Sequence, residues 1–103
     1  MTMKTTVTKR DIAKRVARQV DEKFPLAEKI VSALFTTLRE VMAEADPELR
    51  IEIRDFGVFE VKTTKAKPKA RNPKTGETVY VPPKRKTNFK PGKLLKNALK
   101  KPL

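Results

Sequence analysis

The chain has 103 residues, of which 38% are apolar and 36% are charged, and its formal net charge at pH 7 is +13. This length suits one small domain with a thin hydrophobic core, which a second copy of the chain would help to complete. The absence of Cys and His removes disulfides, thiolate chemistry and the commonest general base and metal ligand, so we expect no enzyme, no metal site and no cofactor.

A flexible lead of residues 1–7 is followed by a first predicted helix. Thr8 and Asp11 have the spacing of a capping box, in which each side chain accepts a hydrogen bond from the other residue's backbone N–H. Apolar residues then recur at helical spacing as far as Val20. The lead lacks the apolar stretch of a signal peptide, and no apolar run reaches the ~20 residues of a membrane span. We therefore expect a soluble, cytoplasmic protein.

The second predicted helix is the most strongly periodic element. Pro25 suits its first turn, and Asp46-Pro47 ends it, because the residue before a proline is disfavoured in helical geometry. Its apolar face consists of Leu26, Ala27, Ile30, Val31, Leu34, Phe35, Leu38, Val41, Met42 and Ala45. The short first helix cannot cover an apolar stripe of this width. Part of the apolar face of the second helix is therefore expected to stay uncovered in the helical hairpin.

A change to strict alternation of apolar and charged residues predicts a half-buried strand over residues 49–54. Asp55-Phe56-Gly57 forms the next turn. A second strand begins at Val58 and is expected to run on through Lys67, where lysines replace the apolar residues. The aromatic residues expected in the core of this sheet and of the second helix, rather than on a base-stacking surface, are Phe35, Phe56, Phe59 and Phe89.

The chain then turns back through residues 71–77 and returns as a strand over residues 78–81. Pro82-Pro83 interrupts this strand, which resumes over residues 84–89. We therefore expect a long hairpin that is apolar at its base and basic at its outer end, over residues 62–86. The outer part has no hydrophobic face to bury, so it is flexible in isolation. Lys90-Pro91-Gly92-Lys93 then opens a final short helix.

Positive charge is concentrated in residues 62–93, where eleven Lys or Arg residues accompany one acid, Glu77, so that this segment carries +10 of the net +13. Surplus charge for solubility rarely excludes acids over such a stretch, and a polyanion is the expected partner. Extended strands with alternate lysines can neutralise phosphates along a groove. The candidates in the arm and the sheet below it are Lys62, Lys65, Lys67, Lys69, Lys84, Arg85 and Lys86. Those near the helices are Lys9, Lys90, Lys93 and Lys96. The lysines of the last helix, Lys93, Lys96, Lys100 and Lys101, serve equally well as a solvated surface, and Lys9 at the start of the first helix is less strongly indicated than they are.

The tip of the arm carries Arg71, Asn72, Pro73 and Lys74. An Arg can respond to the width and potential of the DNA minor groove, and an Asn can bond the acceptors there. A proline at the end of an arm can act as an apolar wedge between base steps and kink the duplex. The alternative is that this segment is only a favourable turn, with Pro73 and Gly76 in turn positions.

The order of these parts resembles the bacterial HU/IHF family of DNA-bending proteins over residues 8 to about 100. The motifs that carry the resemblance are FG-x-F at residues 56–59, RNP-x-TG at residues 71–76 and F-K-P-G-K at residues 89–93. The resemblance implies an α+β fold with a helical hairpin body, a three-stranded antiparallel sheet with a long extended β-arm, and a short C-terminal helix. It also implies an intertwined homodimer, or a heterodimer with a paralogue, whose arms wrap the DNA minor groove and insert Pro73 between bases.

Four places depart from the family's pattern. Asp55 stands where a Gly usually precedes Phe-Gly, and Ala70 where a Gly commonly precedes Arg-Asn-Pro. Pro68 stands where the arm commonly carries an Arg, and Pro82-Pro83 is stiffer than usual. These differences bear on the bend angle and on sequence preference.

We predict a non-enzymatic architectural protein of the nucleoid that binds and bends duplex DNA, with little readout of bases, for chromosome compaction. One alternative is a sequence-preferring regulator of the IHF type, which differs in its specificity ratio. The other is an RNA-binding or ribosome-associated protein, which the basic composition allows equally well. Neither a membrane nor a small-molecule substrate is an expected partner.

Overall fold

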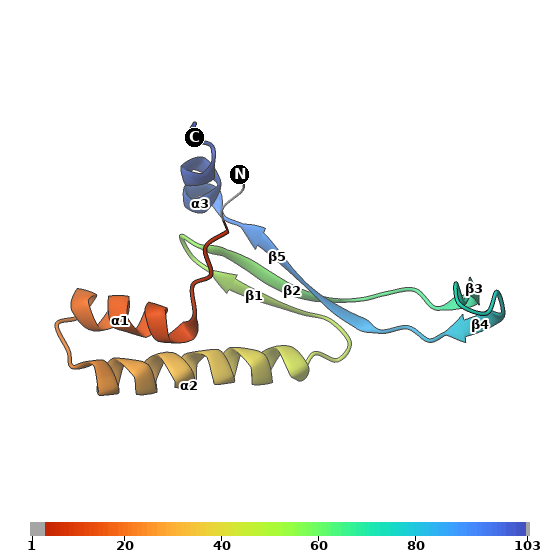
Figure 1. The fold of residues 1–103 in the computed structure, drawn as a ribbon, viewed down its shortest axis with the longest axis horizontal. Helices are drawn as coiled ribbons and strands as arrows, with labels where there is room; N and C mark the ends of the chain where they lie inside the picture. Colours follow the sequence, from red (N-terminus) through yellow and green to blue (C-terminus); the bar gives the residue numbers. More distant parts are fainter. Residues whose placement is uncertain (1–3, 103) are drawn as a thin grey trace. The chain divides into compact units, whose positions relative to one another are not determined.

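The computed structural model describes residues 4–102, without the side chains of Lys67, Pro68 and Ala70. The chain forms two compact units that divide between Glu44 and Ala45. The first contains the helices α1 (Lys9–Gln19) and α2 (Phe24–Ala43). The second contains β1 (Leu49–Ile53), β2 (Gly57–Thr63), β3 (Lys67–Arg71), β4 (Thr78–Val81), β5 (Arg85–Pro91) and α3 (Lys93–Leu99) (Figure 1). No helix within the described range is long and apolar enough to cross a membrane.

The N-terminus of α1 is closed by the predicted capping box. Thr8 Oγ1 accepts from the Asp11 backbone N–H at 3.3 Å, and Asp11 Oδ2 accepts from the Thr8 backbone N–H at 3.0 Å. The hydrogen bonds from the Thr8 backbone and hydroxyl hold the pKa of Asp11 below its ordinary value.

The turn between the helices depends on Asp21, whose φ of 55° lies in the left-handed region. The Glu22 N–H donates to the Ala17 carbonyl at 2.9 Å and the Asp21 N–H to the Arg18 carbonyl at 3.4 Å, which satisfies two of the last carbonyls of α1. The second helix begins at Phe24, so Pro25 lies in its first turn as predicted.

Small residues bring α1 and α2 together. Ala13 and Ala17 of α1 are buried, and Ala27 and Val31 are the buried residues of α2. A second stripe of α2 stays exposed, at Leu26 (45%), Ile30 (57%), Leu34 (53%) and Phe35 (40%). This confirms, within the described chain, that the hairpin leaves a wide apolar surface over. It also shows that Phe35 is not in the core of a single chain.

The sheet of the second unit has the strand order β1-β2-β5, and both pairs are antiparallel. Residues directly opposite each other share a face, so the register sorts the side chains into two sets. The apolar face carries Leu49, Ile51, Ile53, Phe59, Val61 and Phe89. The other face, here called the polar face, carries Arg50, Glu52, Val58, Glu60, Lys62, Lys86, Asn88 and Lys90.

Three phenylalanines hold the base of this sheet. The ring centroids of Phe59 and Phe89 lie 4.8 Å apart, and those of Phe56 and Phe89 lie 5.3 Å apart. Phe59 and Phe89 are half-buried, as expected of core residues, whereas Phe56 is 43% exposed at the turn. Gly57 allows this packing, because a Cβ there would lie 2.5 Å from the Lys90 carbonyl oxygen and 2.7 Å from the Phe89 ring.

The prediction of a long second strand is wrong in one respect. β2 ends at Thr63 and does not continue to Lys67. Beyond it the chain makes a neck. The Thr64 N–H donates to the Lys84 carbonyl at 2.7 Å, and the Lys84 N–H donates to the Thr64 hydroxyl at 3.0 Å. The arm then continues as the separate antiparallel pair β3–β4, in which Arg71 lies opposite Thr78. Pro82-Pro83 does interrupt the returning strand, as predicted.

The end of the chain also differs from expectation. β5 runs on to Pro91, so Lys90 belongs to the sheet and not to the start of the last helix. α3 begins at Lys93, with Gly92 as its N-cap. The Gly92 N–H donates to the Phe56 carbonyl at 2.8 Å, which ties the helix start to the turn between β1 and β2.

Candidate nucleic-acid interface

The tip of the arm is a compact turn organised by Asn72. Its backbone N–H donates to the Glu77 carbonyl at 2.8 Å, and its carbonyl accepts from the Gly76 N–H at 2.7 Å. Its side-chain Oδ1 accepts from the Lys74 N–H at 2.9 Å. Gly76 has φ of 75°, a conformation that glycine adopts without strain. The predicted turn is therefore present, and the half-buried Asn72 is a structural part of it.

The other three predicted tip residues are exposed. Arg71 is the last residue of β3, and Pro73 and Lys74 follow in the turn. Pro73 occupies the outward bend between Asn72 and Lys74, with no packing against a core. An exposed proline between two cations is an arrangement that can reach a polyanion and contact its apolar interior.

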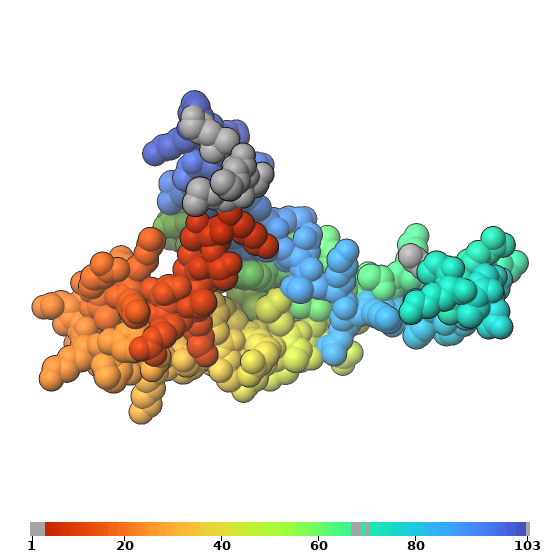
Figure 2. Space-filling model, in the orientation of Figure 1, coloured from red at the N-terminus to blue at the C-terminus, as the bar shows by residue number. Residues whose placement is uncertain are grey.

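The flanks of the arm carry the predicted phosphate-binding lysines. Lys65, in the link between β2 and β3, and Lys69 of β3 are both exposed. Lys67 lies in β3, but its side chain is outside the described part of the structure. In the space-filling view the arm extends from the rest of the second unit (Figure 2). Val79 and Tyr80 of β4 are 38% and 62% exposed. The described side chains of the arm thus form a basic ribbon without a core of its own.

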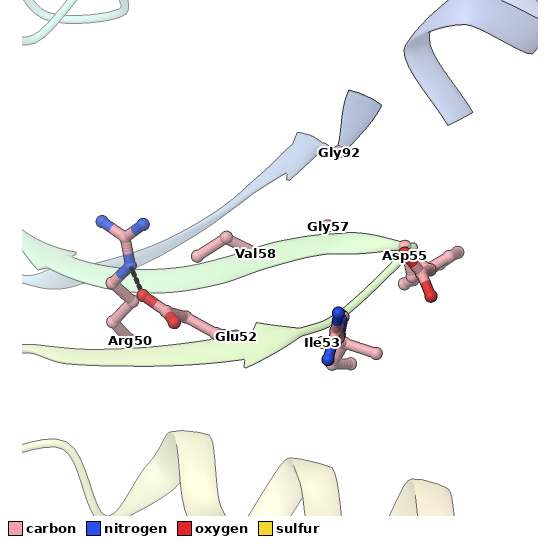
Figure 3. A pocket seen from close by; sticks show the side chains of 9 residues that line it. Arg50, Glu52, Ile53, Asp55, Gly57, Val58 and Gly92 are labelled. Carbon is pink, nitrogen blue, oxygen red and sulfur yellow. Dashed lines mark ion pairs between the residues drawn. The ribbon is translucent and has the colours of Figure 1, made fainter. Parts of the chain in front are cut away.

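The polar face of the sheet brings together lysines from β2 and β5. Lys62 lies directly opposite Lys86, and Lys90 lies four residues further along β5 on the same face. On the same face Arg50 and Glu52 form an ion pair of 2.9 Å beside Val58, which lies opposite Lys90, around an open hollow (Figure 3). The structure thus groups Lys62, Lys86 and Lys90, which sequence reasoning had assigned to two different sets.

Arg85 points away from this group. It lies opposite Thr63, one position from Lys86, and therefore on the apolar face. Its guanidinium donates to the Ala45 carbonyl at 2.7 Å in a partly buried contact. Arg85 thus joins the start of β5 to the start of the second unit, a structural role that its charge did not indicate. Lys84, beside it in the neck, is exposed.

The remaining predicted cations lie on helices. Lys93 and Lys96 are exposed on α3, and Lys9 is the exposed first residue of α1, in the other unit. No group of three or more acidic side chains gathers within the described residues in a way that could hold a metal ion.

Sequence reasoning missed Glu60 on the polar face. Its side chain is nearly buried, and Lys90 Nζ lies 2.9 Å from one of its carboxylate oxygens. The hydrogen bond from Lys90 lowers the pKa of Glu60, against the opposing effect of burial. The period of two residues along β2 places Glu60 and Lys62 on one face, so this signal was present in the sequence.

A basic two-stranded arm joined to an antiparallel sheet with a lysine-bearing face defines a nucleic-acid-binding protein that uses a β-ribbon. Comparison with known proteins agrees. The family model "Bacterial DNA-binding protein" matches residues 7–100. DNA-binding protein HU-1 of Halalkalibacterium halodurans is 36% identical over 90% of this chain and 99% of its own length. DNA-binding protein HU of Geobacillus stearothermophilus is 40% identical over 72% of this chain and 78% of its own length.

The fold is similar to that of a solved Anabaena HU–DNA cocrystal structure, with a TM-score of 0.78 and 28% identity over 93% of this chain and 100% of that one. The chain belongs to the bacterial HU/IHF family of DNA-binding proteins.

Proposed function

We propose that this protein is a non-enzymatic architectural protein of the nucleoid, which binds duplex DNA through its β-arms and bends it by inserting Pro73 between bases in the minor groove. The observation that carries this proposal is the tip, with Arg71, Pro73 and Lys74 exposed, on a ribbon whose described side chains include lysines and form no core. Family membership and the likeness to an HU–DNA cocrystal structure support it.

The protein works as a dimer of this chain or as a heterodimer with a paralogue. The stripe of Leu26, Ile30, Leu34 and Phe35, each at least 40% exposed, supports this state. An apolar surface of this kind is unfavourable in water and marks a protein–protein contact. A dimer carries two arms, and two arms can hold a duplex on both sides of a bend.

Bending is favourable when the extra phosphate contacts of the bent duplex offset an unstacking cost of a few kcal/mol per base step. The lysines of the arm and of the polar face supply such contacts. Base readout in the minor groove is limited, because A·T and T·A pairs present the same acceptors there. The Asn72 carboxamide oxygen accepts from the Lys74 N–H inside the turn, so only its NH2 group can donate to such acceptors. We therefore infer that the shape and charge of DNA, rather than its sequence, select the binding site.

Salt dependence tests the electrostatic part of the proposal. If a dimer neutralises about six to ten phosphates, its affinity for duplex DNA falls roughly 10³- to 10⁵-fold between 50 and 200 mM salt. Duplex RNA competes poorly, because its A-form grooves differ in width and depth from those of B-DNA. A flat salt response, or equal competition by duplex RNA, contradicts DNA as the partner.

Pro73→Ala tests the wedge. The substitution removes the rigid apolar ring but leaves every charge, so bending falls more than affinity does. Bending is measured by FRET between labelled DNA ends or by cyclisation of short duplexes. Lys74→Gln is the matched control, because it lowers affinity and the salt slope while the bend of bound DNA is retained. Equal bending by parent and Pro73→Ala would remove the wedge role.

A further inference from the structure

Glu60 is the one charged residue among the described residues that is classed as buried, at 8% exposed, and it lies in the middle of the cationic side of the sheet. Lys90 Nζ, from β5, is 2.9 Å from Glu60 Oε1. Lys62 Nζ, from β2 like Glu60 itself, is 3.6 Å from Glu60 Oε2. Arg50 of β1 lies directly opposite in the register. One carboxylate therefore binds two ammonium groups from neighbouring strands, one on each oxygen.

The carboxylate and the two lysines differ in their access to solvent. The Glu60 side chain is 11% exposed, whereas those of Lys62 and Lys90 are 54% and 58% exposed. A shallow hollow of about 280 Å³ opens beside them, lined in part by Arg50, Glu60 and Lys62. An anion that approaches from solvent thus meets the ammonium groups first and the carboxylate beneath them.

We propose that Glu60 is a built-in competitor of DNA phosphate, which offsets one of the two positive charges of Lys62 and Lys90 in the free protein and so limits the affinity and salt dependence of the polar face. This inference rests on the proposed function, because it requires phosphates to reach that face. It assigns a role in DNA binding to an acidic residue. Glu60 lowers the affinity for DNA, whereas the two lysines that it pairs with raise it.

The geometry explains why Glu60 competes and does not assist. Its short side chain is fixed by the strand and by burial, so it cannot move aside when a phosphate arrives. The lysines have long flexible stems and strongly hydrated ammonium groups, so they can turn towards an incoming phosphate. In doing so they leave an almost buried carboxylate without its partners, which is unfavourable. With Glu60 ionised the three groups carry +1, and without its charge they carry +2.

Glu60→Gln tests the inference, since the amide has the shape of the carboxylate without its charge. We expect binding about three- to ten-fold tighter at 0.1 M salt for a short duplex. We also expect a steeper plot of log affinity against log salt, because each additional phosphate neutralised adds about 0.9 to the slope. The measurement is fluorescence anisotropy of labelled duplex DNA at several salt concentrations.

A matched control separates local pairing from a general change in charge. Glu52→Gln removes the same charge from the same face, where Glu52 is paired with Arg50 and not with the lysines. Both substitutions are repeated in a Lys62→Met, Lys90→Met background. The tighter binding of Glu60→Gln disappears in that background, whereas any effect of Glu52→Gln persists.

Two results overturn the inference. One is unchanged or weaker binding by Glu60→Gln, which identifies Glu60 as a residue that positions the lysines. The other is a gain that survives without Lys62 and Lys90. If Glu60→Gln does not fold, the carboxyl carbon of Glu60 in the parent is followed by NMR, and its signal shifts on addition of DNA only if the lysines leave it. A parent that binds no duplex DNA refutes the proposed function itself, whereas a parent that binds and a variant that gains nothing refutes only the role of Glu60.

Discussion

The three-stranded sheet and the arm are paired in the same antiparallel way but are held by different interactions. In the sheet, Phe59 and Phe89 pack at 4.8 Å and Val61 is 5% exposed. In the arm, Tyr80 is 62% exposed, and order comes from backbone hydrogen bonds and from the turn at Asn72. A two-stranded ribbon without a buried face is marginal in water. The sheet is therefore the stable element, and the arm depends on a partner for a fixed conformation.

Both regions are basic, but their charges are paired differently. The strands of the sheet, residues 49–53, 57–63 and 85–91, carry five cations and two acids, a net charge of +3, whereas residues 64–84 carry six cations and one acid, a net charge of +5. Both acids of the sheet strands form ion pairs on the polar face, Glu52 with Arg50 and Glu60 with two lysines. The two regions thus differ in burial and in the pairing of their charges, and substitutions can test each property separately.

The largest expected effect comes from removing charge from the arm. A triple substitution of Lys65, Lys69 and Lys74 by Gln removes six candidate phosphate contacts from a dimer. The salt slope then falls by up to about 5, at about 0.9 per phosphate, and affinity falls by at least about a hundred-fold at low salt. Thermal unfolding stays within about 0.5 kcal/mol of the parent, because these side chains are exposed. An unchanged salt slope in anisotropy titrations would show that DNA binds elsewhere.

A second comparison sets a glycine of the sheet against a glycine of the arm. Gly57→Ala forces a Cβ against the Lys90 carbonyl and the Phe89 ring, so we expect a loss of about 1–3 kcal/mol in the free energy of unfolding. Gly76→Ala meets no atom within 4 Å but has φ of 75°, so its strain of about 1–2 kcal/mol stays within the arm tip. Denaturant unfolding should detect the first substitution only. Equal losses would mean that arm and sheet unfold together.

The pH dependence of stability tests the ion pair on the polar face. The pKa of Glu60 is lowered in the folded chain, chiefly by the hydrogen bond from Lys90, so ionised Glu60 stabilises the fold above the ordinary carboxyl pKa of about 4.3. This stabilisation is lost as the pH falls through the lowered pKa. The parent should therefore be more stable than Glu60→Gln at pH 7, and the two should converge below about pH 4. Parallel unfolding curves from pH 3 to pH 7 would contradict the pairing.

The smallest expected effect concerns Asp55, which has φ of 65° in the turn between β1 and β2. Left-handed backbone is strained for residues with a Cβ, although Asp tolerates it better than most. Asp55→Gly should raise the free energy of unfolding by about 0.5–1 kcal/mol, and Asp55→Ala should lower it. Asp21→Gly, at φ of 55° between the helices, is the matched control and should act in the same direction.

Much of this protein was predictable from short stretches of its sequence. The capping box at Thr8 and Asp11, the start of α2 near Pro25, and the turn around Asn72 and Gly76 all appear where the local residues indicate. Each rests on hydrogen bonds or backbone preferences that span three to five residues. The basic ribbon was predictable for a related reason, because its described lysines, Lys65, Lys69, Lys74 and Lys84, are exposed whether or not they lie in a strand.

The neck, the position of Lys90 and the role of Glu60 were not predictable in the same way. β2 ends at Thr63, and beyond it the Thr64 N–H donates to the carbonyl of Lys84, twenty residues away in the sequence. Arg85, a predicted phosphate ligand, instead donates to the Ala45 carbonyl. Glu60 meets Lys90 across the register of β2 and β5. The sequence by itself determined the local elements and the segregation of charge. Only the tertiary structure decided which charges are free and which are paired, because the register of a sheet depends on the packing of its whole apolar face.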